Sequence, residues 1–419
     1  MRKAKRENDL GRDPIGRLLL RLAVPTVTAQ LVNALYNIVD RMYIGHIEGV
    51  GDLALTGLGV CFPVIMFVSA LSALVGMGGG SRAVVRMGAG DPEGANAILG
   101  NCATLLVVLS VVFTILLQLV KEPMLYLFGA TDNTIGYALD YLTIYLWGTI
   151  FVEISLGLNF FITAQGVSAV WVVCFLMGRR TKLRLQRHFA RLDWKVLSPV
   201  LALGVSPFIM QSTESLVNIA FNSSLKAYGG DPAVGAMTIC SSIMQVFYLL
   251  FQGLSQGGQP IVGYNYGAGN LDRVRKTFRL VFTCSLVFST LSCLAIELFP
   301  GMFVAMFNDK PELVEIAVWT LRVYAAGMFM LGIQNSCQQT FVALGQAKIS
   351  LFLALLRKII LLIPLIFILP HFIANQVLAV FLAEPAADIL AALTTGGMFF
   401  WRFPRILRER ENELKKQSA

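Results

Sequence analysis

Asp40 stands inside a long apolar stretch of the sequence and has three polar neighbours at helical spacing. Asn33, Tyr36 and Asn37 precede it by seven, four and three residues, so all four positions share one face of a helix. An ionisable group within a membrane span is costly and usually serves a function. A carboxylate beside amide and phenol oxygens can hold a proton or Na⁺. The alternative is an ion pair of Asp40 with Arg41 near the end of the helix.

A second carboxylate, Glu214, has the same kind of setting. It stands three residues after Gln211 and four before Asn218, and this spacing again makes one polar helix face. Glu214 is therefore a second candidate for holding a proton or Na⁺. The alternative is a buried acid whose oxygens accept hydrogen bonds from neighbouring helices.

A stripe of glutamines follows in the next apolar stretch. Spacings of seven, four and three residues place on one helix face Gln245, Gln252, Gln256 and Gln259. Such a stripe can line a cavity or join helices by hydrogen bonds. Three more acids stand in apolar stretches, namely Glu153, Glu384 and Asp388. We expect these acids to be packing groups or part of a cavity wall, with Arg322 balancing one of them.

The composition identifies the kind of element that must position these groups. Lys and Arg number 34 against 25 Asp and Glu, and 56% of residues are hydrophobic against 14% charged. A soluble domain carries about a quarter charged residues, so this chain is a polytopic membrane protein rather than a soluble, disordered or disulfide-stapled one. The seven cysteines form no CxxC pair, so we expect no metal or redox centre. The sequence contains no nucleotide-binding loop, so we do not expect an ATPase. It also contains no nucleophile–base arrangement of the kind that an enzyme needs.

Ten apolar runs reach the length of about 20 residues that a helix needs to cross a bilayer. They are 22–44, 54–77, 98–120, 137–165, 197–224, 233–256, 278–300, 315–345, 349–370 and 375–400. The run 167–178 is a stub too short to span alone. Lys and Arg are retained on the cytoplasmic side. We assign 29 of the 34 to that side, including Arg357 and Lys358. Both termini are then cytoplasmic, and the net charge of +9 reflects topology rather than nucleic-acid binding.

A shift of 179 residues brings the two halves of the sequence into register. It pairs Gly51-Asp52 with Gly230-Asp231, Gly88-Ala89-Gly90 with Gly267-Ala268-Gly269, and Gly166 with Gly345. We therefore expect two homologous lobes of parallel topology, 1–193 and 194–419. Matching Arg179 to Arg402 takes a shift of 223, so 44 residues of the second half have no counterpart after Gly166. The first lobe then has four spans plus the stub, and the second has six.

These motifs together resemble the multidrug and toxin extrusion (MATE) family of cation-coupled efflux antiporters. The resemblance rests on LYNIVDRMYIGH (35–46), GGGSRAVVRMGAGD (78–91), GVSPFIMQSTESLVNIAFNSSL (204–225) and QGGQPIVGYNYGAGN (256–270). It implies two six-helix bundles around a central cavity, with alternating access driven by Na⁺ or H⁺. It also implies a cation-coupling role for Asp40, and for an acid at Glu214 in some branches. We expect the glycine-rich segments to be tight turns with close helix approach.

The chain departs from the family in its first lobe. The fifth helix of the family ordinarily carries an Asn and an Asp facing the same cavity as the residue that matches Asp40, and this chain lacks that helix. The chain is then either a family member damaged by deletion or the product of an incorrect gene model.

The sequence therefore predicts an all-α polytopic membrane protein that exports amphipathic organic cations in exchange for Na⁺ or H⁺. Asp40 and Glu214 would couple the ion, and the polar neighbours would line the cavity: Asn33, Tyr36, Asn37, Gln211, Asn218, Gln245 and Gln252. We expect a monomer in a bacterial plasma membrane, with no cofactor beyond the coupling ion. The rivals are an inactive remnant and a lipid-linked saccharide flippase, although the latter favours a basic cavity and the midspan charges here are mainly acidic.

Overall fold

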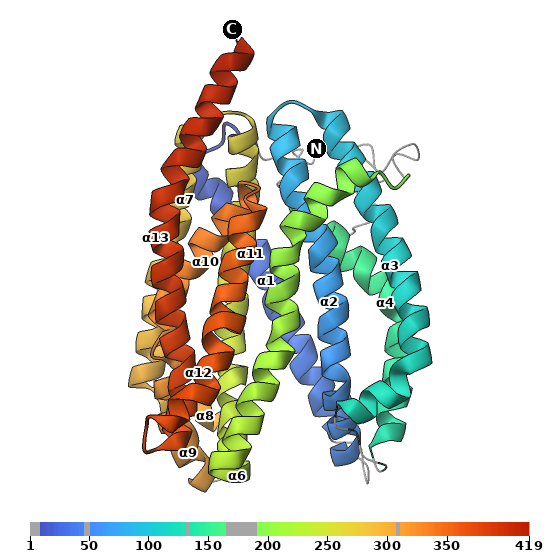
Figure 1. The fold of residues 1–419 in the computed structure, drawn as a ribbon, viewed down its shortest axis with the longest axis vertical. Helices are drawn as coiled ribbons and strands as arrows, with labels where there is room; N and C mark the ends of the chain where they lie inside the picture. Colours follow the sequence, from blue (N-terminus) through green and yellow to red (C-terminus); the bar gives the residue numbers. More distant parts are fainter. Residues whose placement is uncertain are drawn as a thin grey trace, which may run out of the picture.

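The computed structural model describes residues 9–45, 51–128, 130, 132, 134–164, 191–306 and 311–418. It is a bundle of long helices whose two chain ends lie at the same end of the molecule (Figure 1). That end also holds the turns at Gly88–Asp91 and Gly267–Asn270, and we call it the basic end. No strand occurs in the part of the chain that the structure describes, which confirms the all-helical prediction.

The helices in chain order are α1 (Ile15–Gly45), α2 (Gly51–Gly88), α3 (Pro92–Leu127), α4 (Ile135–Ala164), α6 (Trp194–Gly267), α7 (Leu271–Leu298), α8 (Pro300–Ala305), α9 (Pro311–Ala325), α10 (Met328–Ala343), α11 (Ala347–Leu355), α12 (Ile363–Ile368) and α13 (Gln376–Ser418). A π-helical turn, η2 (Leu356–Leu362), joins α11 to α12, and a 3₁₀ turn, η3 (Leu369–His371), follows α12. The long α6 is two helices in one run, because Gly230 breaks it with φ 64° and ψ −161°. Only glycine adopts such a conformation readily.

The predicted count of ten spans is not confirmed. Among the described residues, eight helices are long and apolar enough to cross a membrane. The count is nine if the bent pair Val314–Ala325 and Met328–Ala343, which meet at 43°, is one span. These nine match nine of the ten predicted runs, and the tenth, 22–44, lies within α1. The stub 167–178 lies outside the described residues.

The predicted turns in the glycine-rich segments are present at both copies of the repeat. Gly90 ends the segment after α2 with φ 78°, and Gly269 ends the segment after α6 with φ 76°. After the first turn, Asp91 caps α3 by accepting a hydrogen bond of 2.8 Å from the Gly94 amide. The equal spacing and equal backbone conformation support the 179-residue repeat. The division into lobes at residue 193 stays a prediction.

The first helix of each half packs into a hydrophobic core of the other half. Two core clusters lie within residues 61–200 and two within residues 217–407. Val200, near the start of α6, belongs to a core of the first half. In return, Leu18 and Leu22 of α1 pack with Ile261 and Val281 of the second half. The two halves therefore hold each other at the basic end through their leading helices.

Glycines make this contact close enough for backbones to touch. A Cβ at Gly88 would collide with the carbonyl oxygen of Tyr264, and a Cβ at Gly267 with that of Val85. Each contact becomes the other under the 179-residue shift, so the two halves meet here about a local pseudo-two-fold axis. Small residues of this kind allow membrane helices to approach closely.

A second set of glycines repeats the arrangement deeper in the bundle. Gly78 of α2 faces the backbone of Val200 and Gly204 at the start of α6. Gly257, the repeat partner of Gly78, faces the backbone of Ala23 in α1. The predicted close helix approach at the glycine-rich segments is therefore confirmed, and it joins one half of the chain to the other.

Candidate functional site

Five charged side chains meet inside the membrane-spanning part of the second half. They come from three elements, with Glu214 on α6, Arg357 and Lys358 on η2, and Glu384 and Asp388 on α13. At formal ionisation the cluster carries three negative and two positive charges. Because a lone charge is costly in this setting, the mutual pairing explains how five of them are tolerated.

Arg357 joins η2 to α13 through two carboxylates. Its Nε donates to Asp388 Oδ1 at 2.7 Å, and its Nη2 donates to Glu384 Oε1 at 3.0 Å. All three side chains are buried, with 13%, 10% and 2% exposure for Arg357, Glu384 and Asp388. Glu384 Oε2 is also buried, and no hydrogen-bond partner for it lies among the described residues. This oxygen is a free acceptor within the cluster.

Lys358 joins the same turn to α6. Its Nζ forms an ion pair with Glu214 Oε1 and donates to the Met210 carbonyl oxygen at 3.0 Å. Lys358 is 4% exposed, whereas the Glu214 side chain is 44% exposed. The pair therefore has one buried partner and one partly exposed partner, so Glu214 is the more accessible of the two charges.

The π-helical turn lets two adjacent residues serve two different helices. The Ile363 amide donates to the Lys358 carbonyl, five residues back, instead of the four of an α-helix. Pro364 follows at once, and its ring would clash with the carbonyl four residues earlier in a regular helix. The wider turn relieves that clash. Arg357 then reaches α13 while Lys358 reaches α6.

These two basic residues correct the sequence analysis. Arg357 and Lys358 were assigned to the cytoplasmic side, but they lie within the apolar helix Ala347–His371 and pair with acids there. Arg322, expected to balance an acid, is exposed and has no ion pair among the described residues. The sequence does hold a signal for Arg357 and Lys358, because the two adjacent bases stand in the middle of the apolar run 349–370 and shortly before a proline.

The structure places the other predicted residues as follows. Asn33, Tyr36, Asn37 and Asp40 lie on the continuous helix α1, so their positions do share one helix face, but their side chains lie outside the described part of the chain. Their predicted role in holding a cation stays a prediction.

The predicted polar neighbours of Glu214 do not bind its carboxylate in the described structure. Asn218 is exposed and donates at 2.9 Å to the backbone carbonyl of Glu214, within its own helix. Gln211 and Gln252 are half-buried, and Gln245 is exposed. Of the glutamine stripe, Gln259 joins helices by donating to Gln339 Oε1 at 2.6 Å. Lys358, which the sequence analysis missed, is the partner of Glu214.

Glu153 is the buried acid of the first half. It has no exposed surface, and neither carboxylate oxygen has a hydrogen-bond partner among the described residues. Glu153 is thus a buried acid to which the described residues offer neither a counter-charge nor a hydrogen bond, and its expected role as a packing group or part of a cavity wall stays a prediction.

Comparison with known proteins identifies the family. The MatE family model matches two stretches, residues 25–178 and 207–368, one in each half. The Multidrug export protein MepA of Staphylococcus haemolyticus (strain JCSC1435) is 19% identical, with 90% of this chain and 92% of the relative covered. The protein of the same name from Staphylococcus aureus (strain N315) is 21% identical over 85% of this chain and 88% of the relative.

Solved structures of MATE transporters are also similar to this chain. The structure of the MATE multidrug transporter DinF-BH in complex with R6G is 30% identical, with a TM-score of 0.85 over 97% of this chain and 99% of that chain. A MATE crystal structure in the bent conformation has a TM-score of 0.87 at 18% identity, with 96% of this chain and 98% of that chain covered, and supports the fold alone.

The S. haemolyticus alignment also bears on the expected gap. It runs over 424 positions but takes in 90% of 419 residues, about 377, which leaves about 47 positions without a residue of this chain. This number is close to the 44 residues missing from the internal repeat. The relatives matched here are transporters rather than enzymes. With the family model covering most of its length in two copies, the chain belongs to the MatE family of multidrug efflux transporters.

Proposed function

We propose that the protein is a cation-coupled antiporter that exports amphipathic organic cations, with Na⁺ or H⁺ as the coupling ion. The observation that carries the proposal is the ion pair between the sealed Lys358 and the accessible Glu214. A proton or Na⁺ arriving at Glu214 competes with Lys358 for the same carboxylate. The names of the MepA and DinF-BH relatives support multidrug export.

Binding of an ion at Glu214 would change how the helices are attached to one another. While the pair is intact, it ties α6 to η2, and Arg357 on the same turn ties η2 to α13. When an ion takes the carboxylate, Lys358 loses its ion pair and keeps its hydrogen bond to the Met210 carbonyl oxygen of α6. Loading the ion therefore weakens the attachment of η2 to α6, while Arg357 keeps η2 attached to α13. Asp40 on α1 is the proposed coupling carboxylate of the first half.

The glycine contacts suggest which side is closed. Gly88 and Gly267 bring the two halves into backbone contact at the basic end. We infer that this end faces the cytoplasm, with both termini there, because Lys and Arg are retained on that side. The conformation would then be closed to the cytoplasm, and drug uptake from inside requires the two halves to part at these glycines. We place the protein, as a monomer that does not bind nucleic acid, in a bacterial plasma membrane.

The two rival functions differ in support. A lipid-linked saccharide flippase moves an anionic substrate and favours a basic cavity, but the membrane-embedded cluster holds three acids against two bases. An inactive remnant is favoured by the roughly 47 alignment positions that this chain leaves empty. The remnant is therefore the rival that the experiment must address.

The test is ethidium efflux from cells that make the 419-residue chain. We expect efflux from the wild type and its loss in Asp40→Asn and in Glu214→Gln. The control is Glu315→Gln, which changes an exposed acid without an ion pair in the described structure. Efflux that persists in both acid variants would contradict ion coupling at these carboxylates. Absence of efflux from a wild-type protein present in the membrane would favour the remnant over the antiporter.

A further inference from the structure

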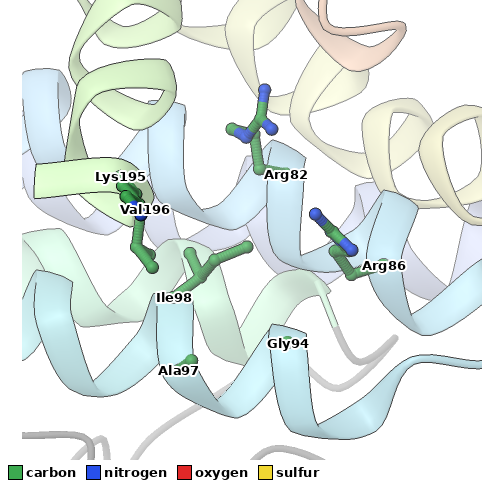
Figure 2. Close-up of a pocket in the computed structure, with 7 residues that line it drawn as sticks. All are labelled: Arg82, Arg86, Gly94, Ala97, Ile98, Lys195 and Val196. Atoms are coloured by element: carbon green, nitrogen blue, oxygen red, sulfur yellow. The ribbon is translucent and has the colours of Figure 1, made fainter. Parts of the chain in front are cut away.

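A cavity of about 140 Å³ lies at the basic end of the first half, between α2, the first turns of α3 and the start of α6. Arg82 and Arg86 extend from α2 on one side, and Lys195 lies on the other, with Ile98 between them (Figure 2). Gly94 of α3 completes the wall near the helix start. Three basic residues thus line the cavity together with the apolar side chains of Ile98 and Val196.

Only one of the three cations is neutralised by the described part of the chain. Arg86 Nη1 pairs with Asp91 Oδ2 at 2.9 Å, and the other oxygen of Asp91 caps α3 at the Gly94 amide. No ion pair or hydrogen bond of the Arg82 or Lys195 side chain occurs within the described residues. Within the described residues, Arg82 and Lys195 therefore have no carboxylate partner at the cavity.

Burial makes the lack of a carboxylate partner costly for Arg82. Arg82 is half-buried and stands one helical turn from Arg86, so two like charges share one helix face. A partly desolvated guanidinium is stabilised by an anion that its planar donors can grip. The adjacent stretch of sequence cannot supply one. Residues 165–190, which connect α4 to α6, contain five Lys and Arg and no Asp or Glu.

Two neighbouring features indicate the chemistry of the missing anion. Trp194, next to Lys195, is 70% exposed, and exposed tryptophans mark the level of lipid headgroups in membrane proteins. The positive end of the 36-residue α3 also lies beside the cavity, where Asp91 already caps the first turn. Basic pockets between helices at this level bind lipid headgroups.

We propose that this cavity binds a phosphate group, supplied by an anionic phospholipid of the adjacent leaflet. Arg82 and Lys195 grip the phosphate, and Ile98 contacts the glycerol portion. Since Arg82 belongs to α2 and Lys195 to the start of α6, the bound lipid bridges the two halves of the chain beside their glycine contact.

The experiment uses the full chain purified in a neutral detergent. Phosphatidylglycerol, phosphatidylcholine with the same acyl chains, and inorganic phosphate are each titrated, and binding is read by native mass spectrometry and by the melting temperature. We expect saturable binding and a raised melting temperature with phosphatidylglycerol. The double variant Arg82→Gln/Lys195→Gln should bind it on the order of tenfold more weakly, since two charge-assisted contacts are lost.

A matched variant separates the site from general charge. Arg408→Gln/Lys416→Gln removes two exposed cations of α13 at the same end of the molecule and should leave binding unchanged. Equal protection by millimolar inorganic phosphate, lost in the cavity variant, would keep the phosphate site but assign it to soluble phosphate. Equal affinity of the cavity variant and the wild type for phosphatidylglycerol would overturn the proposal. Neither outcome depends on whether the protein transports drugs.

Discussion

The two halves of the chain share one fold but differ in whether the acids within their helices are paired with bases. In the second half, Glu214, Glu384 and Asp388 are held by Arg357 and Lys358 on a single π-helical turn. In the first half, Glu153 is sealed without a partner among the described residues. An acid paired with a base can exchange that base for an incoming ion, whereas Glu153 has no such base to exchange among the described residues.

The repeat shows that the difference is local. The 179-residue shift places Glu153 of α4 opposite Gly332 of α10. A Cβ at Gly332 would lie 2.6 Å from the Ser289 hydroxyl of α7, so that helix pair has no room for a side chain. The first half keeps a carboxylate where the second half packs helices directly. The shared fold therefore does not require an acid at this point in either half.

The largest expected effect comes from removing the base that holds two acids. Arg357→Met leaves Glu384 and Asp388 buried and unpaired, and breaking a buried ion pair in this way typically costs about 3–5 kcal/mol. We expect a strongly lowered melting temperature for the purified protein. Adding Glu384→Gln and Asp388→Asn to the same variant should restore most of the loss. A single variant as stable as the wild type would show that the cluster contributes nothing to the fold.

A smaller effect is expected where the two halves touch. Gly88→Ala and Gly267→Ala each place a Cβ against a backbone carbonyl of the other half, and overpacking of this kind costs about 1–3 kcal/mol. Because the contacts are reciprocal, the two variants should part the halves at the basic end by similar amounts. The distance between spin labels at the exposed positions Glu93 and Lys276 measures this parting.

The control for the glycine variants is Gly148→Ala. Nothing lies within 4 Å of a Cβ at Gly148, so the label distance should match the wild type. If only one of Gly88→Ala and Gly267→Ala lengthens the distance, the pseudo-two-fold description of the contact is wrong.

The smallest effect is expected at the lone acid of the first half. Glu153→Leu replaces a carboxyl group that makes no described hydrogen bond by an apolar group of similar size. Such a change is close to neutral or stabilising, within about 1 kcal/mol. Melting temperature and ethidium efflux should both stay near wild type. A large loss of stability would show that Glu153 has a partner, and loss of efflux alone would give it a part in transport.

The sequence predicts much of the fold because apolar length and glycine spacing act locally. Among the described residues, eight of the ten predicted runs are single helices long and apolar enough to cross a membrane. A ninth run is the pair of helices that meet at 43°. The turns at Gly90 and Gly269 follow from segments that repeat at 179 residues. Close approach at these glycines was also predicted, although the reciprocal partners Tyr264 and Val85 emerge only from the packing of one half on the other.

The candidate site was less accessible to prediction. The sequence shows the acids of the cluster, but Arg357 and Lys358 have the same chemistry as the basic residues that mark the cytoplasmic side. Counting charges cannot tell a retained loop residue from a base paired inside a span. The pairing depends on the π-helical turn before Pro364, which aims adjacent side chains at different helices. The proline marks where the helix widens, but the partners of Arg357 and Lys358 depend on how α6 and α13 pack against this turn.

The most direct test of ion coupling at the Glu214–Lys358 pair uses the purified chain in sealed proteoliposomes. An imposed ethidium gradient is applied with no other driving force, and H⁺ and Na⁺ movement is followed in separate experiments. We predict that ethidium flux drives one of these ions in the opposite direction, and that Glu214→Gln loses this exchange while Glu315→Gln retains it. Ethidium movement that carries neither ion, or exchange that is unchanged in Glu214→Gln, would contradict coupling at this carboxylate.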